Sequence, residues 1–559
     1  MRKYTLLILL LLAAVVTITR FTGGPKPHTT PKVPQADNKP AMIKAVHYFS
    51  SGLPASFWGS FEYSQVDDDF AQIKADGFNT IILVIPWRGF ETGFEDGVPE
   101  PSLLYDRLDW LLEKIDQAGL AYGLRLGFPH NFDPANGITA SELCTNIYVN
   151  SALRDNWVQY LARIAERVDQ HRDSFRFAFF SWEDFFCSII SFPQLEENQR
   201  VNIARQSGYQ AWLAEHHTMQ AVERLYGQSF DSMDAVPVPE RKSPAFQFFL
   251  NFIDQFMIHQ LLLPGRQVFP ELAMEVRVDK DPVYNGSEMI WSGHDLALSD
   301  DRMRGSYWGA YYGADNRGEV LTAREALKNF EYMLNEVSDQ GENINHIVEQ
   351  FNFADNTPGY ADQHAQIDSG ELPAFLKGAA KLLKLRSMGY GLWAYRDYVD
   401  SAIYNSSFEL GLRGWDSLGL AEVITNDDGD KALRMHAGTV ISQTFAPFDR
   451  FGGLETSEKL TFCADFIHLA EPAHITLLLD GEHLGTLDVN ETGQQCTTMD
   501  ARNLRQPEVV ISLLSSGELQ IDDLRLYTFV QSLNVYDENG EPGPLRDLIV
   551  RLNTDWLAD

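Results

Sequence analysis

The stretch GFNTIILVIPWRGFETGFEDGVPEPSLLYDRLDWLLEKIDQAGLAYGLRLGF, residues 77–128, determines the fold class. Residues 78–87 are a continuous apolar run, which is typical of a strand buried on both faces. Residues 103–119 have helical periodicity and end in Gly, and residues 120–128 form a second strand pattern. A strand, a helix and a strand in this order predict a βαβ unit with parallel strands.

The same alternation extends along the chain in both directions. It predicts further strands at residues 43–50, 175–182, 271–279, 304–313, 345–353 and 389–398, helices at 151–172, 321–339 and 372–388, and a helical insertion around 195–260. Eight strands with helices between most of them predict an α/β protein built on a (β/α)8 TIM barrel with insertions. In such a barrel the chemistry lies at the C-terminal ends of the strands.

The pattern changes after Tyr404, where short alternating stretches separated by Gly, Asp and Asn turns replace the helices. We therefore expect a barrel over residues 41–403, followed by an all-β, jelly-roll-like sandwich over residues 404–530. Residues 531–559 are expected to be a C-terminal extension that ends in a short helix.

Residues 1–20 are typical of an export signal, because Met-Arg-Lys precedes a nearly pure apolar run from Leu6 to Ile18. No small-x-small cleavage site follows, so this segment is either a cleaved signal peptide or a short membrane anchor. Residues 21–40 carry five prolines and no apolar periodicity, which predicts a linker. The protein is expected in the periplasm or outside the cell, with a membrane tether in the anchor case.

The composition excludes some partners and suggests a compartment. With 78 acidic and 45 basic residues the net charge is −33, which argues against nucleic acid or anionic lipid surfaces as partners. The four cysteines fall by region, Cys144 with Cys187 and Cys463 with Cys496. Two disulfides within these regions would suit an oxidising compartment, and four buried free thiols are the alternative.

Two glutamates stand at the ends of predicted barrel strands. Glu183 directly follows the fourth strand, where an ionised carboxylate is costly unless it is paired or used, and Glu349 falls near the end of the seventh. Cleavage of a glycosidic bond with retention needs one carboxyl group as acid and an ionised one as nucleophile. The two glutamates are predicted to face each other at about 5–5.5 Å. For each alone, a salt bridge or a capping contact is the alternative.

Residues 77–128 resemble the second-to-third-strand region of the retaining TIM-barrel glycoside hydrolase superfamily, the β-galactosidase/cellulase-like clan. Trp87 matches a Trp near the end of the strand in that group, and Arg125 matches an Arg in the following strand. The resemblance implies that Glu183 is the acid/base, that Glu349 is the nucleophile and that Trp393 on strand eight is a sugar platform.

The chain departs from that group at one position. Trp182 stands where those families usually carry Asn, which hydrogen-bonds the 2-hydroxyl of the substrate. The sugar therefore cannot be inferred from the resemblance, and the neighbouring Asp184 is an alternative functional acid.

Side chains near the strand ends are candidates for sugar contacts, because pyranose faces stack on aromatic rings and hydroxyls bond to polar groups. For the aromatic residues core packing is the alternative, and for Arg125 the choice is between orienting the nucleophile and a buried ion pair. No zinc-ligand spacing or phosphate-binding loop occurs in the sequence, so no cofactor is expected for catalysis. The candidates are His47, Trp87, Arg125, His130, Asn131, Trp182, Tyr307, Trp308, Tyr311 and Trp393.

The segments NSSFELGLRGW (405–415) and IDDLRLY (521–527) resemble the opening and closing strands of jelly-roll carbohydrate-binding modules. The resemblance implies a structural calcium with Glu409 and Asp522 among its oxygen ligands. A sandwich that only buttresses the barrel is the alternative.

These observations lead to a hypothesis of an exported retaining glycoside hydrolase that acts on a polysaccharide or oligosaccharide. A non-catalytic, membrane-tethered glycan-binding scaffold is one alternative. A transglycosylase is another, because it uses the same two carboxylates.

Overall fold

The computed structural model describes most of the chain after the linker. At residues 92, 100–101, 183, 283–284, 289–290, 305–307 and 336–340 only the backbone is described. The described residues are 41–50, 52, 54–60, 63–92, 100–101, 103–130, 138–181, 183–185, 187–275, 283–284, 289–290, 305–307, 319–340, 346–353, 366–399, 401–426, 429–445, 459–500, 508–533 and 535–558.

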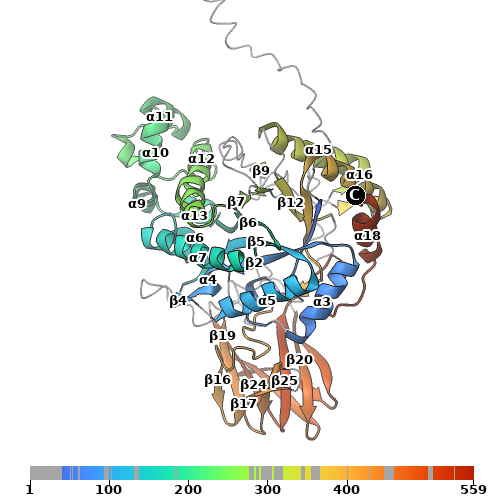
Figure 1. The fold of residues 1–559 in the computed structure, drawn as a ribbon. Helices are drawn as coiled ribbons and strands as arrows, with labels where there is room; N and C mark the ends of the chain where they lie inside the picture. The colour runs from blue at the N-terminus through green and yellow to red at the C-terminus, as the bar shows by residue number, and fades with distance from the viewer. Residues whose placement is uncertain are drawn as a thin grey trace, which may run out of the picture. The chain divides into compact units, whose positions relative to one another are not determined.

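Eight parallel strands form one sheet in the order β10-β12-β14-β1-β2-β5-β6-β7, part of which is visible in Figure 1. The two ends of this order, β7 and β10, contact each other, so the sheet closes into a barrel. Each strand lies within one of the eight predicted segments, and the TIM-barrel prediction is confirmed. The strands are β1 (Ile43–His47), β2 (Thr80–Pro86), β5 (Ala121–Phe128), β6 (Phe175–Ser181), β7 (Leu272–Glu275), β10 (Gly305–Tyr307), β12 (His346–Phe351) and β14 (Gly389–Leu392).

Inside the barrel, the side chains nearer the N-terminal ends of the strands are apolar, and those nearer the C-terminal ends are polar. Because side chains alternate between the faces of a strand, every second residue points inward. The inward residues nearer the N-terminal ends form a buried cluster that includes Ala45, Ile82, Phe177, Phe179 and Ala273. The next inward positions toward the C-terminal ends are His47, Arg125, Ser181, Glu275 and Glu349, which we call the polar layer.

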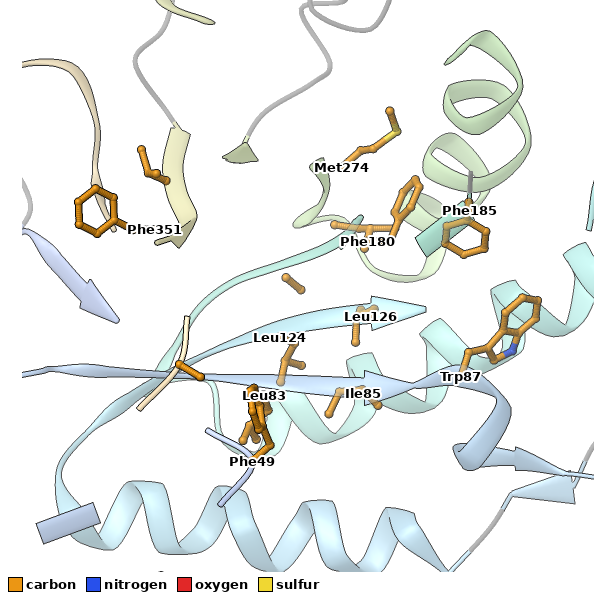
Figure 2. Close-up of a cluster of buried hydrophobic side chains, with 14 of the residues drawn as sticks. Phe49, Leu83, Ile85, Trp87, Leu124, Leu126, Phe180, Phe185, Met274 and Phe351 are labelled. Carbon is orange, nitrogen blue, oxygen red and sulfur yellow. The ribbon is translucent and has the colours of Figure 1, made fainter. Parts of the chain in front are cut away.

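The outward side chains of the strands pack against helices. α5 (Leu104–Ala118) ends at Gly119, whose φ of 65° lets its N–H reach the carbonyls of Ile115 and Asp116. α7 (Ser151–Gln170) begins after Asn150, whose side chain accepts from the N–H of Ala152 at 2.9 Å. Figure 2 shows Leu83, Ile85, Leu124 and Leu126 of β2 and β5 within the resulting hydrophobic cluster.

The remaining elements of the barrel region are short or belong to the predicted helical insertion, which α9 to α12 form. Helices and helical turns are α2 (Pro54–Phe57), α3 (Tyr63–Ala75), α4 (Trp87–Phe90), α6 (Ala140–Asn146), η2 (Glu183–Phe185), α8 (Cys187–Ser191), η3 (Phe192–Gln194), α9 (Glu197–Ser207), α10 (Tyr209–His216), α11 (Met219–Tyr226), η4 (Met233–Ala235), α12 (Phe246–Phe256), η5 (Met257–Leu262), α13 (Leu263–Val268), α15 (Ala323–Gln340), η6 (Ser369–Glu371) and α16 (Leu372–Arg386). Two-residue strands are β3 (Glu91–Thr92), β4 (Glu100–Pro101), β8 (Val283–Tyr284), β9 (Met289–Ile290), β11 (Val320–Leu321), β13 (Gln366–Ile367), β15 (Tyr398–Val399) and β26 (Val530–Gln531).

Two antiparallel five-stranded sheets follow the barrel strands, in the orders β16-β19-β24-β21-β22 and β17-β18-β25-β20-β23. Their inward residues share one hydrophobic core, so the predicted all-β sandwich is present. The strands are β16 (Asp416–Leu418), β17 (Ala421–Thr425), β18 (Lys431–Met435), β19 (Val440–Phe445), β20 (Lys459–Leu469), β21 (Ala473–Leu479), β22 (Glu482–Val489), β23 (Gly493–Asp500), β24 (Val509–Ser515) and β25 (Leu519–Tyr527).

The chain returns to the barrel after the sandwich. β26 pairs with β15, and α18 (Arg546–Arg551) continues into η7 (Leu552–Trp556). Ile549 and Leu552 join the hydrophobic core of the barrel, and Asn553 accepts from the hydroxyl of Tyr390 on β14 at 2.6 Å. The predicted terminal helix is present, and it covers the barrel between β14 and β1, where Lys44 donates to the carbonyl of Asn553 at 3.1 Å.

Both predicted disulfides are present, Cys144–Cys187 and Cys463–Cys496. The alternative of four free thiols is therefore wrong. Within the described part of the chain, no helix combines the length and the apolar character that a membrane crossing needs. The apolar run from Leu6 to Ile18 lies outside the described residues.

Candidate active site

Glu349 lies inside the barrel near the C-terminal end of β12, and its side chain has no exposed surface. The pairing of β12 with β14 gains one extra residue between Val348 and Phe351, which is a β-bulge of the kind that redirects side chains at barrel rims. Gly391 on β14 makes room for it, because a Cβ there would lie 2.4 Å from the carbonyl oxygen of Glu349. The bulge in β12 and the glycine on β14 together therefore determine the position of this carboxylate.

His47 at the end of β1 contacts Glu349 directly. The imidazole Nε2 lies 3.2 Å from Oε2 of Glu349, and neither side chain has exposed surface. The other ring nitrogen, Nδ1, lies 3.2 Å from the carbonyl oxygen of Leu392. Burial, followed by the charge of Arg125, lowers the pKa of His47 to about 3, so the imidazole is neutral at ordinary pH.

Trp393, which directly follows β14, lies beside His47 of this pair. Its ring centroid is 4.7 Å from that of His47, and it is partly exposed. The indole N–H donates to the hydroxyl of Tyr398 at 3.0 Å, which fixes the orientation of the ring. The guanidinium of Arg125 lies 5.8 Å from the centre of the same ring, within cation–π range.

Arg125 on β5 forms a two-point ion pair with Asp184. Its Nε donates to one carboxylate oxygen at 3.1 Å and its Nη2 to the other at 2.7 Å, and both side chains are buried. Of the two roles considered for Arg125, the structure therefore shows the buried ion pair. Asp184, whose two oxygens both accept from Arg125, is a poor candidate for the functional acid.

The turn η2, which begins with Glu183 directly after β6, is held from three sides. Asp184 is held by Arg125, the hydroxyl of Tyr148 donates to the carbonyl of Phe185 at 2.8 Å, and the Cys144–Cys187 disulfide closes just beyond the turn. The side chain of Glu183 lies outside the described part, so the 5–5.5 Å separation from Glu349 stays a prediction.

Glu275, the last residue of β7, was missed by sequence reasoning. It is buried in the polar layer, pairs in register with Ser181 of β6 and accepts a hydrogen bond from the Ser181 hydroxyl. The signal was present, because Glu275 is two residues after the inward-facing Ala273 and ends its strand. The polar layer of the barrel thus contains a second buried carboxylate besides Glu349.

The structure packs Trp87 into the core. Its side chain is fully buried between Trp157 and Tyr160, and its indole N–H donates to Asn156 at 2.8 Å. Figure 2 shows Trp87 within the hydrophobic cluster. Because the ring has no free face and its polar atom is satisfied, this position favours core packing over the predicted sugar contact.

The other predicted sugar contacts are described only in part. His130 follows β5, is partly exposed and lies 5.2 Å from the ring of Phe128. Tyr307 is the last residue of β10, and only its backbone is described. Asn131, Trp182, Trp308 and Tyr311 lie outside the described residues.

The predicted calcium ligands, Glu409 and Asp522, lie in an acidic cluster of the sandwich. Burial raises the pKa of Asp522 to about 9, and the negative charges of Asp523, Glu409 and Asp430 add to this effect. The described residues contain no group of three or more carboxylate, histidine or cysteine side chains arranged to hold a metal. The Lys431 ammonium lies 2.6 Å from the carbonyl oxygen of Glu409 and 4.0 Å from its carboxylate, so a cation already stands beside one predicted ligand.

Comparisons with known proteins retrieve solved structures only. No family model and no curated protein matches the chain. An exo-β-1,4-mannosidase from Opitutaceae bacterium strain TAV5 has 10% identity and a TM-score of 0.38 over 64% of this chain and 52% of its own. A GH5_18 protein from Streptomyces cattleya, solved with GlcNAc, has 10% identity and a TM-score of 0.40 over 64% and 71%.

An endo-1,4-β-mannanase from Rhizomucor miehei has 10% identity and a TM-score of 0.36 over 64% of this chain and 88% of its own. For the mannosidase, in contrast, the match spans only about half of that protein, 52% of its length. Scores of this size do not decide between activities. The structures named here are GH5 proteins and related glycoside hydrolases, and this chain is similar to each of them over 64% of its length.

Proposed function

We propose that the protein is an exported retaining glycoside hydrolase of a polysaccharide or oligosaccharide, with Glu349 as nucleophile and Glu183 as acid/base. The observation that carries this proposal is the position of Glu349, inward-facing in the bulge of β12 and beside His47, whose ring packs against Trp393. Glu183 begins a braced turn after β6, a strand that β7 and β10 separate from β12 around the barrel. Two carboxyl groups in this arrangement suit a double displacement.

Other features support the proposal that the enzyme is exported and binds sugars. The two disulfides suit an oxidising compartment, as expected after export. The partly exposed Trp393 offers an aromatic face to a pyranose ring. The sandwich is proposed to bind carbohydrate, on the resemblance of its first and last strands.

The test is covalent trapping of the nucleophile. Purified protein is incubated with activated 2-deoxy-2-fluoro glycosides of several sugars, and peptides are searched by mass spectrometry for an adduct. We expect the adduct on Glu349, because a fluorine at C2 slows hydrolysis of the glycosyl ester. Glu349→Gln should show no adduct. Glu183→Gln should be labelled slowly with glycosides whose leaving group needs a proton from the acid, and at the normal rate with those whose leaving group needs none.

The outcome separates the alternatives. A transglycosylase forms the same adduct but passes the sugar to an added acceptor faster than to water. A glycan-binding scaffold binds sugar without an adduct or turnover, and its affinity is unchanged in Glu349→Gln. Labelling of a different carboxylate would overturn the assignment of Glu349.

A further inference from the structure

The contact between His47 and Glu349 needs a proton. A backbone carbonyl only accepts hydrogen bonds, so the contact of Nδ1 with the carbonyl of Leu392 assigns the ring proton to Nδ1. In the neutral ring, Nε2 is then an acceptor, and it lies 3.2 Å from the Glu349 carboxyl oxygen without the alignment of a hydrogen bond. Two acceptors at this distance in a site without exposed surface repel each other.

We propose that His47 and Glu349 share one proton between Nε2 and Oε2 in the resting protein, and that His47 is a positioning residue for Glu349. This inference rests on the proposed function in the role that it gives to Glu349. It replaces the sequence-based expectation that His47 contacts sugar. His47 has no exposed surface, its ring packs against Trp393, and both of its nitrogens face protein atoms.

The charged groups around the pair indicate where the proton resides. Arg125 on β5 acts on the imidazole and disfavours its charged form, as does burial, which together lower the pKa of His47 to about 3. Asp184 balances the charge of Arg125 through the two-point ion pair. The other titratable group of the polar layer is Glu275 on β7, which β10 separates from β12. The shared proton is therefore carried mainly by the carboxyl of Glu349.

The shared proton affects the reaction in a defined direction. Glu349 attacks the anomeric carbon only as a carboxylate, so one proton must leave the pair to solvent before the glycosyl ester forms. At low pH the pair keeps its proton, and kcat/KM falls as the pH decreases. The His47–Glu349 pair thus sets the acid limb of the pH profile.

The first test reads the proton without any substrate. Infrared difference spectra between wild type and Glu349→Gln are recorded from pH 5 to pH 9, and the tautomer of His47 is read by nitrogen NMR of histidine-labelled protein. We expect the carbonyl stretch of a protonated carboxyl group that disappears in Glu349→Gln, together with an Nδ1-protonated ring. An ionised Glu349 at pH 5, or a ring protonated at Nε2 alone, would overturn the proposal.

The second test uses two amide variants, each of which places an amide nitrogen near the position of one ring nitrogen. In His47→Gln the amide can donate to Glu349 and favour the carboxylate, so the acid limb should move to lower pH. In His47→Asn the amide keeps the hydrogen bond to the carbonyl of Leu392 but no longer reaches the carboxyl group of Glu349. We therefore expect kcat to fall about tenfold or more while KM changes little. A sugar contact would instead raise KM in both variants and leave the acid limb in place, which would contradict a positioning role.

His346 supplies the matched control. It is another buried histidine, it lies at the opposite end of β12, and burial lowers its pKa to about 4. His346→Gln should change stability without moving the acid limb. If no glycoside is turned over by wild type, the proposed function fails, whereas the spectra still decide whether the pair shares a proton.

Discussion

Glu183 and Asp184 are adjacent acids, and we propose different roles for them. Asp184 forms the buried ion pair with Arg125, and this pair holds the turn on which Glu183 stands. A buried charge with a matched partner fixes the backbone around it, because moving either group would leave the other uncompensated. Glu183 is then free to be the proton donor that we propose, on a turn fixed by its neighbour.

Asp184→Asn tests this division of roles. The change leaves Arg125 as a buried charge without its carboxylate, so the free energy of unfolding should fall by about 3–5 kcal/mol. Because the turn with Glu183 loosens, the labelling rate of Glu349 should fall as well. The exposed pair Arg172–Glu271 is the control, since Glu271→Gln should cost less than about 1 kcal/mol in urea unfolding. Equal effects of the two variants would contradict the bracing role.

Asp522 predicts a pH-dependent stability of the protein. Its pKa is about 9 in the folded state, mainly because of burial, against 3.8 ordinarily, so the folded state holds a proton that the unfolded state releases. The stabilising contribution is complete below about pH 4 and is lost as the pH rises toward 9. In EDTA, Asp522→Asn should therefore melt higher than wild type at pH 7, and the difference should vanish at pH 4.

The same variant tests the proposed calcium. A bound divalent cation would favour the ionised carboxylate, so calcium should raise the melting temperature of wild type above its value in EDTA. It should leave Asp522→Asn unchanged. Identical melting of wild type with calcium and with EDTA would contradict a calcium site and favour Lys431 as the cation of this cluster.

At the scale of elements, the Cys144–Cys187 disulfide links α6 to α8, the helix that directly follows η2 along the chain. The two cysteines are 43 residues apart, so replacing both by Ser should lower stability by about 4 kcal/mol through the entropy of the unfolded chain. Activity should fall in addition, because the bridge closes next to the turn with Glu183. Both effects are measurable by urea unfolding and by the labelling rate.

The second disulfide is the control for this prediction. Cys463 and Cys496 are paired neighbours on β20 and β23 of the sandwich, 33 residues apart. Their replacement by Ser should cost a similar amount of stability and leave the labelling rate unchanged. If the barrel bridge affected stability alone, its link to the site would be disproved.

At the scale of the whole molecule, the sandwich stands in sequence between the last barrel strand and the helix that covers it. Asn553 on η7 donates to the carbonyl of Asp76 at 3.0 Å and accepts from Tyr390, and Arg546 pairs with the carboxylate of Asp76 at 2.8 Å. Figure 1 shows α18 beside α16, and α16 contacts η7, which continues α18. The barrel is therefore completed only by the last residues of the chain.

Removal of residues 546–559 should thus unfold the barrel, although every strand of the sandwich would remain. The milder variant Asn553→Ala should lower the melting temperature, because it leaves the buried hydroxyl of Tyr390 without its partner. The exposed neighbour Asp555 is the matched control, and Asp555→Ala should have little effect. A truncated protein that melts like the full chain would show that the final helix is dispensable.

The sequence by itself determined the eight barrel strands, the main helices, the sandwich and the region in which each cysteine pairs. These features follow from local patterns, since continuous apolar runs, helical periodicity and turn residues lie within a few positions of each other. The position of Glu349 at the end of a strand belongs to this group, because the end of the apolar run marks the end of the strand.

The tertiary structure alone decided how the polar side chains pair. Arg125 meets Asp184, His47 meets Glu349, and Glu275 joins the same layer, although these residues are dozens to hundreds of positions apart. It also turned Trp87 toward the core and returned the last helix to the barrel. Such contacts depend on closing the barrel, and a residue's type does not reveal which distant partner will satisfy it once water is excluded.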